Sequence, residues 1–286
     1  MKKLITLFGF IFLYVNTWAQ VNLPEIFFVN YQQHYAPINP AHLGFSESKS
    51  VDLRYASYNG AKKVLKSMYA DVVFNPIDSL RIRSGLQAYA FHEGEFIQYN
   101  NIKWLNSYSV TNQRDFKLAF ALGLGAVNYS YVNNVEQASD WGFDMDAGLW
   151  LEYKKWNVGL SGKHILPTIL KPIETTFKLN QMAHFIVRYK LINTLNTSLE
   201  TSVHYVYNSQ VFMDLPLSLY NHLVYKKTLV GICNVNGLSL LTIGVGFQEN
   251  KQYHLPFSLN IAFQQKLNDK TITPNNRYEI GLHKKF

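Results

Sequence analysis

Hydrophobic and polar residues alternate along most of the chain, in segments of about ten residues between residues 51 and 286. The clearest segment is GFDMDAGLWLEY (142–153), in which Phe143, Met145 and Leu149 share one face while Asp144 and Asp146 share the other. A period of two is typical of a β-strand whose two faces meet different surroundings, whereas a helix would spread both sets around its axis. The pattern therefore predicts an all-β protein.

Clusters of Asn, Gly, Pro, Lys and Asp separate these segments and are typical of turns. The alternation predicts about fourteen strands, an even number as in single-chain bacterial barrels. The expected strands cover residues 51–60, 67–75, 80–92, 96–110, 116–132, 142–153, 156–165, 184–192, 198–208, 213–226, 228–235, 238–248, 255–266 and 277–286. Within 116–132 the apolar phase shifts beyond Gly125 to Val127, Tyr129 and Tyr131, which indicates either a bulge or a strand that rises above a bilayer.

The composition favours a membrane protein of the barrel type. The chain is 48% hydrophobic and 15% aromatic but only 16% charged, yet beyond the N-terminus it has no run of roughly 20 apolar residues that could form a membrane-spanning helix. Because barrel strands need only one apolar face, a mean hydropathy of -0.10 is compatible with a membrane. We therefore predict a transmembrane antiparallel β-barrel of about fourteen strands. A periplasmic β-sandwich would also alternate and is the alternative fold.

Aromatic residues at the ends of the expected strands strengthen the membrane interpretation, because barrels carry Tyr and Trp where the lipid meets water. They are Tyr153, Trp156, Tyr205, Tyr207 and Tyr225.

The first twenty residues predict export. Lys2 and Lys3 precede an apolar stretch from Leu4 to Val15, and Thr17-Trp18-Ala19 offers a small-x-small cleavage site. We expect a signal peptide at 1–19, an N-terminal extension at 20–50 that is either a plug in the lumen or a periplasmic segment, and an outer-membrane barrel at 51–286.

The formal net charge is +8, and removal of the expected signal peptide would lower it by two, because Lys2 and Lys3 leave with it. Dispersed Lys and Arg residues in an exported chain favour anionic lipid headgroups, and not nucleic acid, as the partner of this charge. Cys233 is the only cysteine, so it predicts no internal disulfide.

The sequence predicts no enzyme, no cofactor and no metal. The nine histidines are not paired with other ligands at the local spacings typical of metal sites, and no nucleophile motif is present. Asp144 and Asp146 would both face the lumen, where a cation could bridge them. We expect Lys or Arg from neighbouring strands to balance them instead.

Three segments resemble the PorP/SprF family of type IX secretion system outer-membrane proteins. NYQQHYAPINPAHLG (30–44) is similar to its N-terminal signature, and NVGLSGKHILP (157–167) is similar to a family strand that contains His164. NRYEIGLHKKF (276–286) resembles both the closing strand and a barrel insertion signal, although Lys284 departs from the expected apolar residue. The matching residues are Gln32 or Gln33, Tyr35, Asn39, Pro40, Ala41 and Gly44 in the first segment, and Glu279, Gly281 and Phe286 in the last.

The chain also departs from the family. LRYASYNG replaces an Arg-Asn-Gln-Trp-like element after the first strand, and a Gly-Tyr-Ser-Tyr-Asp run is missing before the closing strand. The resemblance is therefore to a divergent member.

The resemblance implies an accessory barrel that supports secretion or surface attachment of cargo such as adhesins by protein–protein binding. Its partners would be outer-membrane lipid, components of the periplasmic ring and secreted adhesins. The implied partner-binding residues are Gln33, Tyr35, Asn39, Pro40, Ala41, Gly44 and His164. The alternative is a passive porin or small-solute uptake channel, which an open lumen would favour and a plugged lumen would disfavour. A hydrolase ranks last, because no Ser, His and carboxylate set shares one face.

Overall fold

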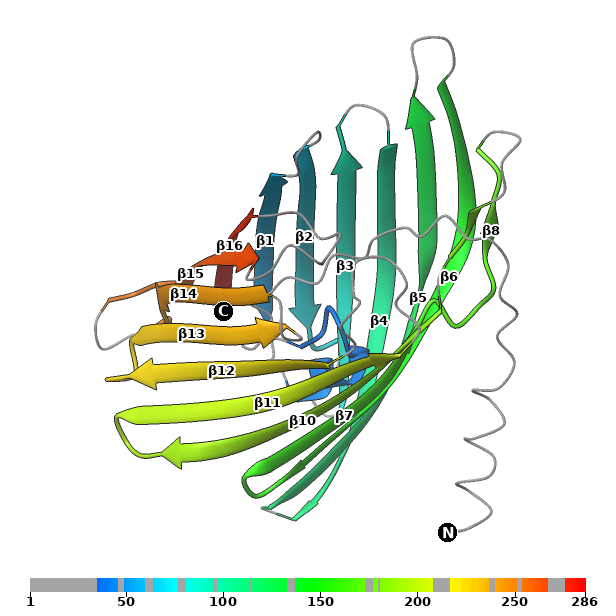
Figure 1. The fold of residues 1–286 in the computed structure, drawn as a ribbon. Coiled ribbons are helices and arrows are strands. Elements are labelled where there is room, and N and C mark those ends of the chain that lie inside the picture. Colours follow the sequence, from blue (N-terminus) through cyan, green and yellow to red (C-terminus); the bar gives the residue numbers. More distant parts are fainter. Residues whose placement is uncertain are drawn as a thin grey trace.

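Fourteen antiparallel strands close into a barrel in the computed structural model (Figure 1). The structure describes residues 35–45, 49–59, 64–76, 81–94, 97–113, 115–132, 137–172, 177–179, 181–207, 217–236, 240–250, 254–266 and 276–286. The barrel strands are β1 (Ser50–Asn59), β2 (Val64–Phe74), β3 (Ile82–Glu93), β4 (Ile97–Gln113), β5 (Phe116–Val132), β6 (Gln137–Tyr153), β7 (Trp156–Lys163), β10 (Met182–Asn193), β11 (Thr197–Tyr207), β12 (Leu217–Tyr225), β13 (Leu229–Asn236), β14 (Leu240–Phe247), β15 (Ser258–Lys266) and β16 (Asn276–Lys285). The predicted fold is confirmed.

Each strand pairs with its neighbour along the chain, except that β7 pairs with β10 across a long connection. That connection carries a separate two-stranded sheet of β8 (Ile169–Leu170) and β9 (Phe177–Lys178). The barrel closes between the first and last strands, from Ser50 opposite Lys285 to Asn59 opposite Asn276. We call the end that holds Ser50 and Lys285 the terminal end of the barrel, and the other the opposite end.

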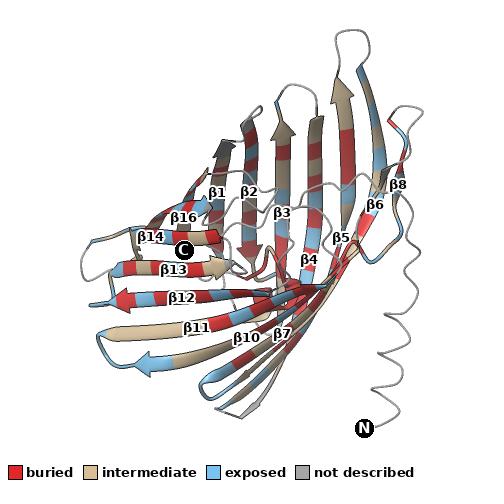
Figure 2. Cartoon of the chain, in the orientation of Figure 1, coloured by how far each residue is buried: buried red, intermediate tan, exposed pale blue. Residues whose placement is uncertain are grey.

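Buried and exposed residues alternate along the strands, as the bands in Figure 2 show. On β5, Leu122 and Leu124 are exposed on the outer face, whereas Ala119 and Ala121 are buried on the inner face. Because the outer face would lie in water if the protein were soluble, this band of exposed apolar side chains is best explained by contact with lipid.

The polarity of both faces inverts near Gly125. Pairing of β5 with β4 and with β6 continues without interruption through this point, so no bulge is present. Beyond it Asn128 and Ser130 share the outer face with Ala126, while Val127 and Tyr129 are buried inside. The structure thus excludes a bulge at this point. The rise of the strand above the bilayer stays a prediction, with which the polar outer side chains of β5 agree.

A hydrophobic cluster fills the inner side of this raised region. Leu170 and Leu179, from the connection that carries β8 and β9, pack there against Val127 and Tyr129. The strands β4, β5 and β6 have 17 residues each, whereas β12 to β16 have 8 to 10, so one side of the barrel stands higher than the other (Figure 1).

The aromatic residues expected at strand ends are exposed. Tyr153 ends β6, Trp156 begins β7 and Tyr225 ends β12, all at the terminal end, and Tyr207 ends β11 at the opposite end. Within the part of the chain that the structure describes, no helix is long and apolar enough to span a membrane. The predicted signal peptide at 1–19 lies outside the described residues and stays a prediction.

Candidate functional site: a segment bound in the barrel lumen

Residues 35–45, which precede the first strand, lie against the inner wall of the barrel. Their last part forms a short 3-10 helix, η2 (Pro40–Phe45), which contacts β3, β4, β5, β6 and β7. Inward side chains of the wall bind its backbone: Gln87 donates to Ala36 O at 3.0 Å, Ser161 to Ile38 O at 2.8 Å and Lys163 to Pro37 O at 2.9 Å. Further donors are Ser107, which binds Ala41 O, and Ser109, which binds Gly44 O. The polar lumen thus satisfies backbone groups that have few partners within the segment itself.

Asn39 is fully buried, like Ala41 and Leu43 of the same segment, and is the one polar side chain of the three. Its Nδ2 donates to Leu149 O at 3.1 Å and to Leu160 O at 3.2 Å, and its Oδ1 accepts from Ala41 N at 3.0 Å. Leu149 and Leu160 are opposite each other on β6 and β7. One side chain therefore joins the segment to two strands and also fixes its own turn, with Pro40 restricting the backbone between them.

Two glycines of the wall make room for this contact. A Cβ on Gly148 would lie 2.3 Å from Asn39 Oδ1 and 3.0 Å from Pro40 Cδ, and one on Gly159 would lie 2.5 Å from the Trp150 ring and 3.0 Å from Asn39 Nδ2. Close approach of another backbone segment to a sheet is a common reason for glycine in a strand. Gly148 and Gly159 thus form a cradle for Asn39.

Tyr35 anchors the other end of the segment on the far side of this cradle. Its hydroxyl donates to Ser202 Oγ of β11 at 3.4 Å, and its ring packs against Trp150 with the ring centroids 5.0 Å apart. The Arg188 guanidinium lies 5.5 Å from the ring centroid. Burial raises the pKa of the Tyr35 hydroxyl, an effect that Arg188 partly opposes, so the hydroxyl keeps its proton at neutral pH.

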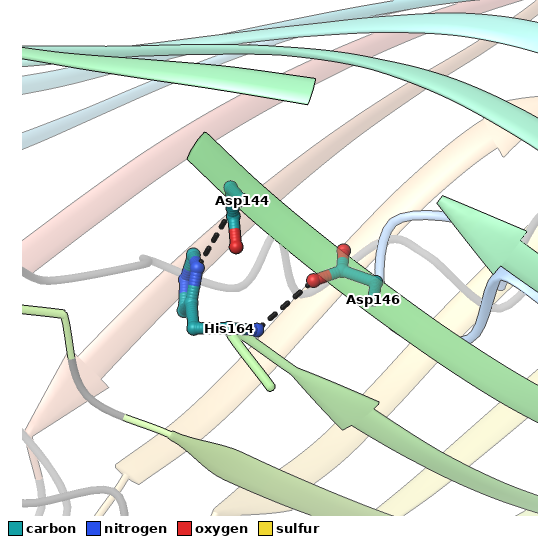
Figure 3. A group of neighbouring side chains, drawn as sticks. All are labelled: Asp144, Asp146 and His164. Atoms are coloured by element: carbon teal, nitrogen blue, oxygen red, sulfur yellow. Dashed lines mark hydrogen bonds and ion pairs between the residues drawn. The ribbon is translucent and has the colours of Figure 1, made fainter. Parts of the chain in front are cut away.

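A buried charged network lies beside the segment, at the junction of β6 with the end of β7 (Figure 3). Asp144 Oδ2 contacts His164 Nδ1 at 2.8 Å and accepts from Asn101 Nδ2 at 2.8 Å, while Asp146 Oδ1 accepts from His164 N at 3.0 Å. Lys103 Nζ lies 2.7 Å from Asp144 Oδ2 and 2.6 Å from Asp146 Oδ2. The expected balance of the two carboxylates by a lysine is what the structure has.

Glycines on β5 allow Lys103 to reach across one strand. Lys103 of β4 lies opposite Gly125, which in turn lies opposite Asp144 of β6. A Cβ on Gly125 would lie 2.7 Å from Lys103 Cγ, and one on Gly123 would lie 2.5 Å from Leu105 Cδ2. The inward residues of β5 are thus small enough for the side chains of Lys103 and Leu105 from β4 to pack over them.

The charges of this network balance one another within it. Ligand atoms of Asp144, Asp146 and His164 lie within 4.8 Å of one another, a spacing that could suit a metal ion. The Lys103 ammonium, however, already contacts both carboxylates and supplies the positive charge that such an ion would bring. His164 has a φ of 52° and directly follows the last residue of β7, so the network also fixes the point at which the chain leaves the wall.

A buried pair of histidines, separate from the charged network, was not apparent from local spacing. His184 Nδ1 on β10 lies 3.0 Å from His204 Nε2 on β11, and the two rings are stacked. Cross-strand pairing places them together, although they are 20 residues apart in the sequence.

The residues that the family resemblance singled out fall into three places. Tyr35, Asn39, Pro40 and Ala41 are buried in the lumen, and Gly44 follows them in η2. His164 belongs to the charged network, and Gln33 lies outside the described residues. Contact of these residues with a partner protein stays a prediction. Lys103, Gly148 and Gly159 complete the site, and sequence inspection had not connected them with it.

The predicted insertion signal lies on the closing strand. Glu279 is buried and accepts from Arg277 at 2.9 Å, and Gly281 lies opposite Arg54 of β1. Phe286 is 70% exposed beyond the end of β16. Recognition of these residues by an assembly factor stays a prediction.

Comparisons with known proteins agree with this architecture. A family model described as type IX secretion system membrane protein PorP/SprF matches residues 22–283. No curated protein matches the chain. Among solved structures, the Ralstonia pickettii toluene transporter TbuX is similar with a TM-score of 0.54 and 13% identity over 88% of this chain and 93% of that chain. The CymD monoaromatic hydrocarbon channel is similar with a TM-score of 0.55 and 13% identity, over 88% of this chain and 92% of that chain. At such identities the likeness shows the fold alone.

Proposed function

Because the chain belongs to the PorP/SprF family of type IX secretion system membrane proteins, we propose that it is an accessory outer-membrane barrel of that system. In this proposal it supports secretion or surface attachment of cargo such as adhesins by binding proteins, and carries out no chemistry. Its partners would be components of the periplasmic ring or the secreted cargo itself.

The observation that carries the proposal is the docking of residues 35–45 in the lumen. The segment is held by side chains of β3, β4, β7 and β11, and its Asn39 lies against Gly148 and Gly159, where an added Cβ would come within 2.3 Å and 3.0 Å of the Asn39 side chain. A segment fixed in the lumen would narrow a pore for passive solute flow. A barrel that positions a protein segment benefits from it, because preorganisation lowers the entropy cost of binding.

The test is to replace Asn39-Pro40-Ala41 with Gly-Ser-Gly and to measure barrel level, display of a type IX cargo and uptake of a small solute in the same cells. We expect normal insertion and reduced display, since the strands do not include this turn. A point variant, Asn39→Ala, should act in the same direction.

The matched control is Asn221→Ala. Asn221 Nδ2 also donates to a strand carbonyl, Cys233 O at 3.0 Å, but it lies outside the lumen. Unchanged display together with increased uptake in the turn variant would contradict a secretion role and show that the segment only blocks a pore.

The second candidate is an uptake channel for small apolar solutes. It is favoured by the fold shared with hydrocarbon channels and by the apolar inner face at the opposite end, where Tyr129 and Val127 lie. Uptake of a hydrocarbon by cells that carry the wild-type barrel, without any effect of the protein on cargo display, would favour this candidate.

A further inference from the structure

Lysine pairs occupy two of the tight turns at the terminal end of the barrel. Lys154 and Lys155 join β6 to β7, and Lys226 and Lys227 lie between β12 and β13. All four are exposed. Within the described part of the chain, none of these four has a carboxylate within ion-pair distance, so their charge faces outward unneutralised.

The backbone of these turns is unusual for lysine. Lys154, Lys226 and Lys227 have φ values of 54°, 52° and 59°, in the left-handed region. Glycine and asparagine adopt this region at lower cost and are the common choice in hairpin turns. Turn formation alone therefore does not explain why lysine stands at these three positions.

Backbone hydrogen bonds tie the two lysine-bearing turns to neighbouring parts of the barrel end. Lys154 N donates to Asp115 O at 3.1 Å, Lys190 N to Lys155 O at 3.0 Å and Lys227 N to Asn196 O at 3.2 Å. The first bond joins the β4–β5 and β6–β7 turns, the second joins the β6–β7 turn to β10, and the third joins the β10–β11 and β12–β13 turns. The backbone that carries these lysines is thus bonded to its neighbours, and we call the four residues the basic rim: Lys154, Lys155, Lys226 and Lys227.

Exposed aromatic side chains lie next to these lysines, on the outer face of the wall. The Lys154 ammonium lies 5.2 Å from the centroid of the Tyr153 ring, and that of Lys226 lies 5.5 Å from the Tyr225 ring. Trp156 is exposed on the adjoining strand. Aromatic rings on the outside of a barrel mark the level of the lipid headgroups, so the ammonium groups lie at or just beyond that level.

We propose that the basic rim binds the phosphate groups of anionic phospholipids in the leaflet around the terminal end. Short turns face the periplasm in outer-membrane barrels, and the β4–β5 and β6–β7 turns are the shortest here, so this leaflet is the inner one. A lipid is favoured over an acidic protein because Lys154 and Lys226, one in each turn, lie over a ring on the lipid-facing side of the wall. The proposal does not depend on a role in secretion.

The experiment counts lipids bound to the full purified barrel by native mass spectrometry. The barrel in neutral detergent is mixed with equal amounts of phosphatidylglycerol and phosphatidylcholine that have the same acyl chains. We expect the wild type to retain phosphatidylglycerol preferentially. The variant Lys154→Gln with Lys226→Gln should lower the ratio of the two bound lipids by about fivefold or more.

The control is Lys171→Gln with Lys178→Gln, which removes the same charge from the connection at the opposite end of the barrel. It should leave the ratio unchanged, and a heat-dependent gel shift confirms that both variants are folded. Equal ratios in all three proteins, or an equal fall in both variants, would overturn the proposal. So would a rim variant that keeps its lipid preference but loses cargo display, since the surface would then bind a protein.

Discussion

Substitution of Gly148 by alanine should release the N-terminal segment from the lumen wall. The added Cβ would lie 2.3 Å from Asn39 Oδ1 and 3.1 Å from Ala41 N, which is the donor that this same oxygen binds. The oxygen cannot withdraw without moving Nδ2 away from the carbonyls of Leu149 and Leu160. The variant therefore weakens all three hydrogen bonds of Asn39 at once.

Each such bond contributes about 0.5–1.5 kcal/mol net, so the docked state should lose about 2–4 kcal/mol. That corresponds to roughly 30- to 1,000-fold in the docking equilibrium. Single-channel recording in planar bilayers should detect this as a larger fraction of time in conducting states than for the wild type. The barrel itself should remain folded, because the strand keeps its pairing.

Gly231→Ala is the matched control, because a Cβ there would meet nothing closer than Leu223 Cβ at 3.8 Å. Both variants add one methyl group to a strand glycine. If Gly148→Ala conducts no more than Gly231→Ala while both are folded, the cradle does not hold the segment and the argument from Asn39 fails.

Three further predictions concern the barrel wall. The purified protein should give a circular dichroism spectrum dominated by β-structure and migrate faster on gels when unheated; a helical spectrum would contradict the fold. Leu122→Arg should lower the free energy of unfolding in liposomes by about 2–4 kcal/mol, whereas Ala121→Ser should be nearly silent, and comparable losses would contradict the assigned faces. Lys103→Met should cost about 3–5 kcal/mol, because it leaves Asp144 and Asp146 buried without a cation, and Lys103→Met with both carboxylates changed to Asn should recover most of that loss in urea unfolding.

The strands could be predicted from the sequence because lipid on one side and polar groups on the other impose an alternation on every residue within the bilayer. The same reason explains why the sequence did not predict the first part of β6. Residues 137–141 extend β6 but were not expected, since the outer residues Gln137 and Ser139 are polar and the inner residue Asp140 does not contrast with them, so the period of two is lost here.

The site was predictable only in part. Alternation placed Asp144 and Asp146 together, but their partner Lys103 follows from the register of three strands, which local periodicity does not contain. His164 reaches the carboxylates only because its backbone turns out of β7 at a φ of 52°, where the sequence pattern had predicted that the strand continues to residue 165. The cradle glycines could be noticed as small inward residues but not assigned to Asn39.

The position of the lumen segment in the chain affects the order in which its contacts can form during assembly. Tyr35 precedes every strand, yet its hydroxyl binds Ser202, which lies 167 residues later on β11. Tyr35 can therefore complete its contacts only after β11 has joined the sheet, whereas none of the contacts described for the segment needs the seam between β1 and β16. Contacts of such long sequence separation form late and slow folding. Docking of the segment therefore belongs to a late stage of assembly, when most of the wall that binds it has formed.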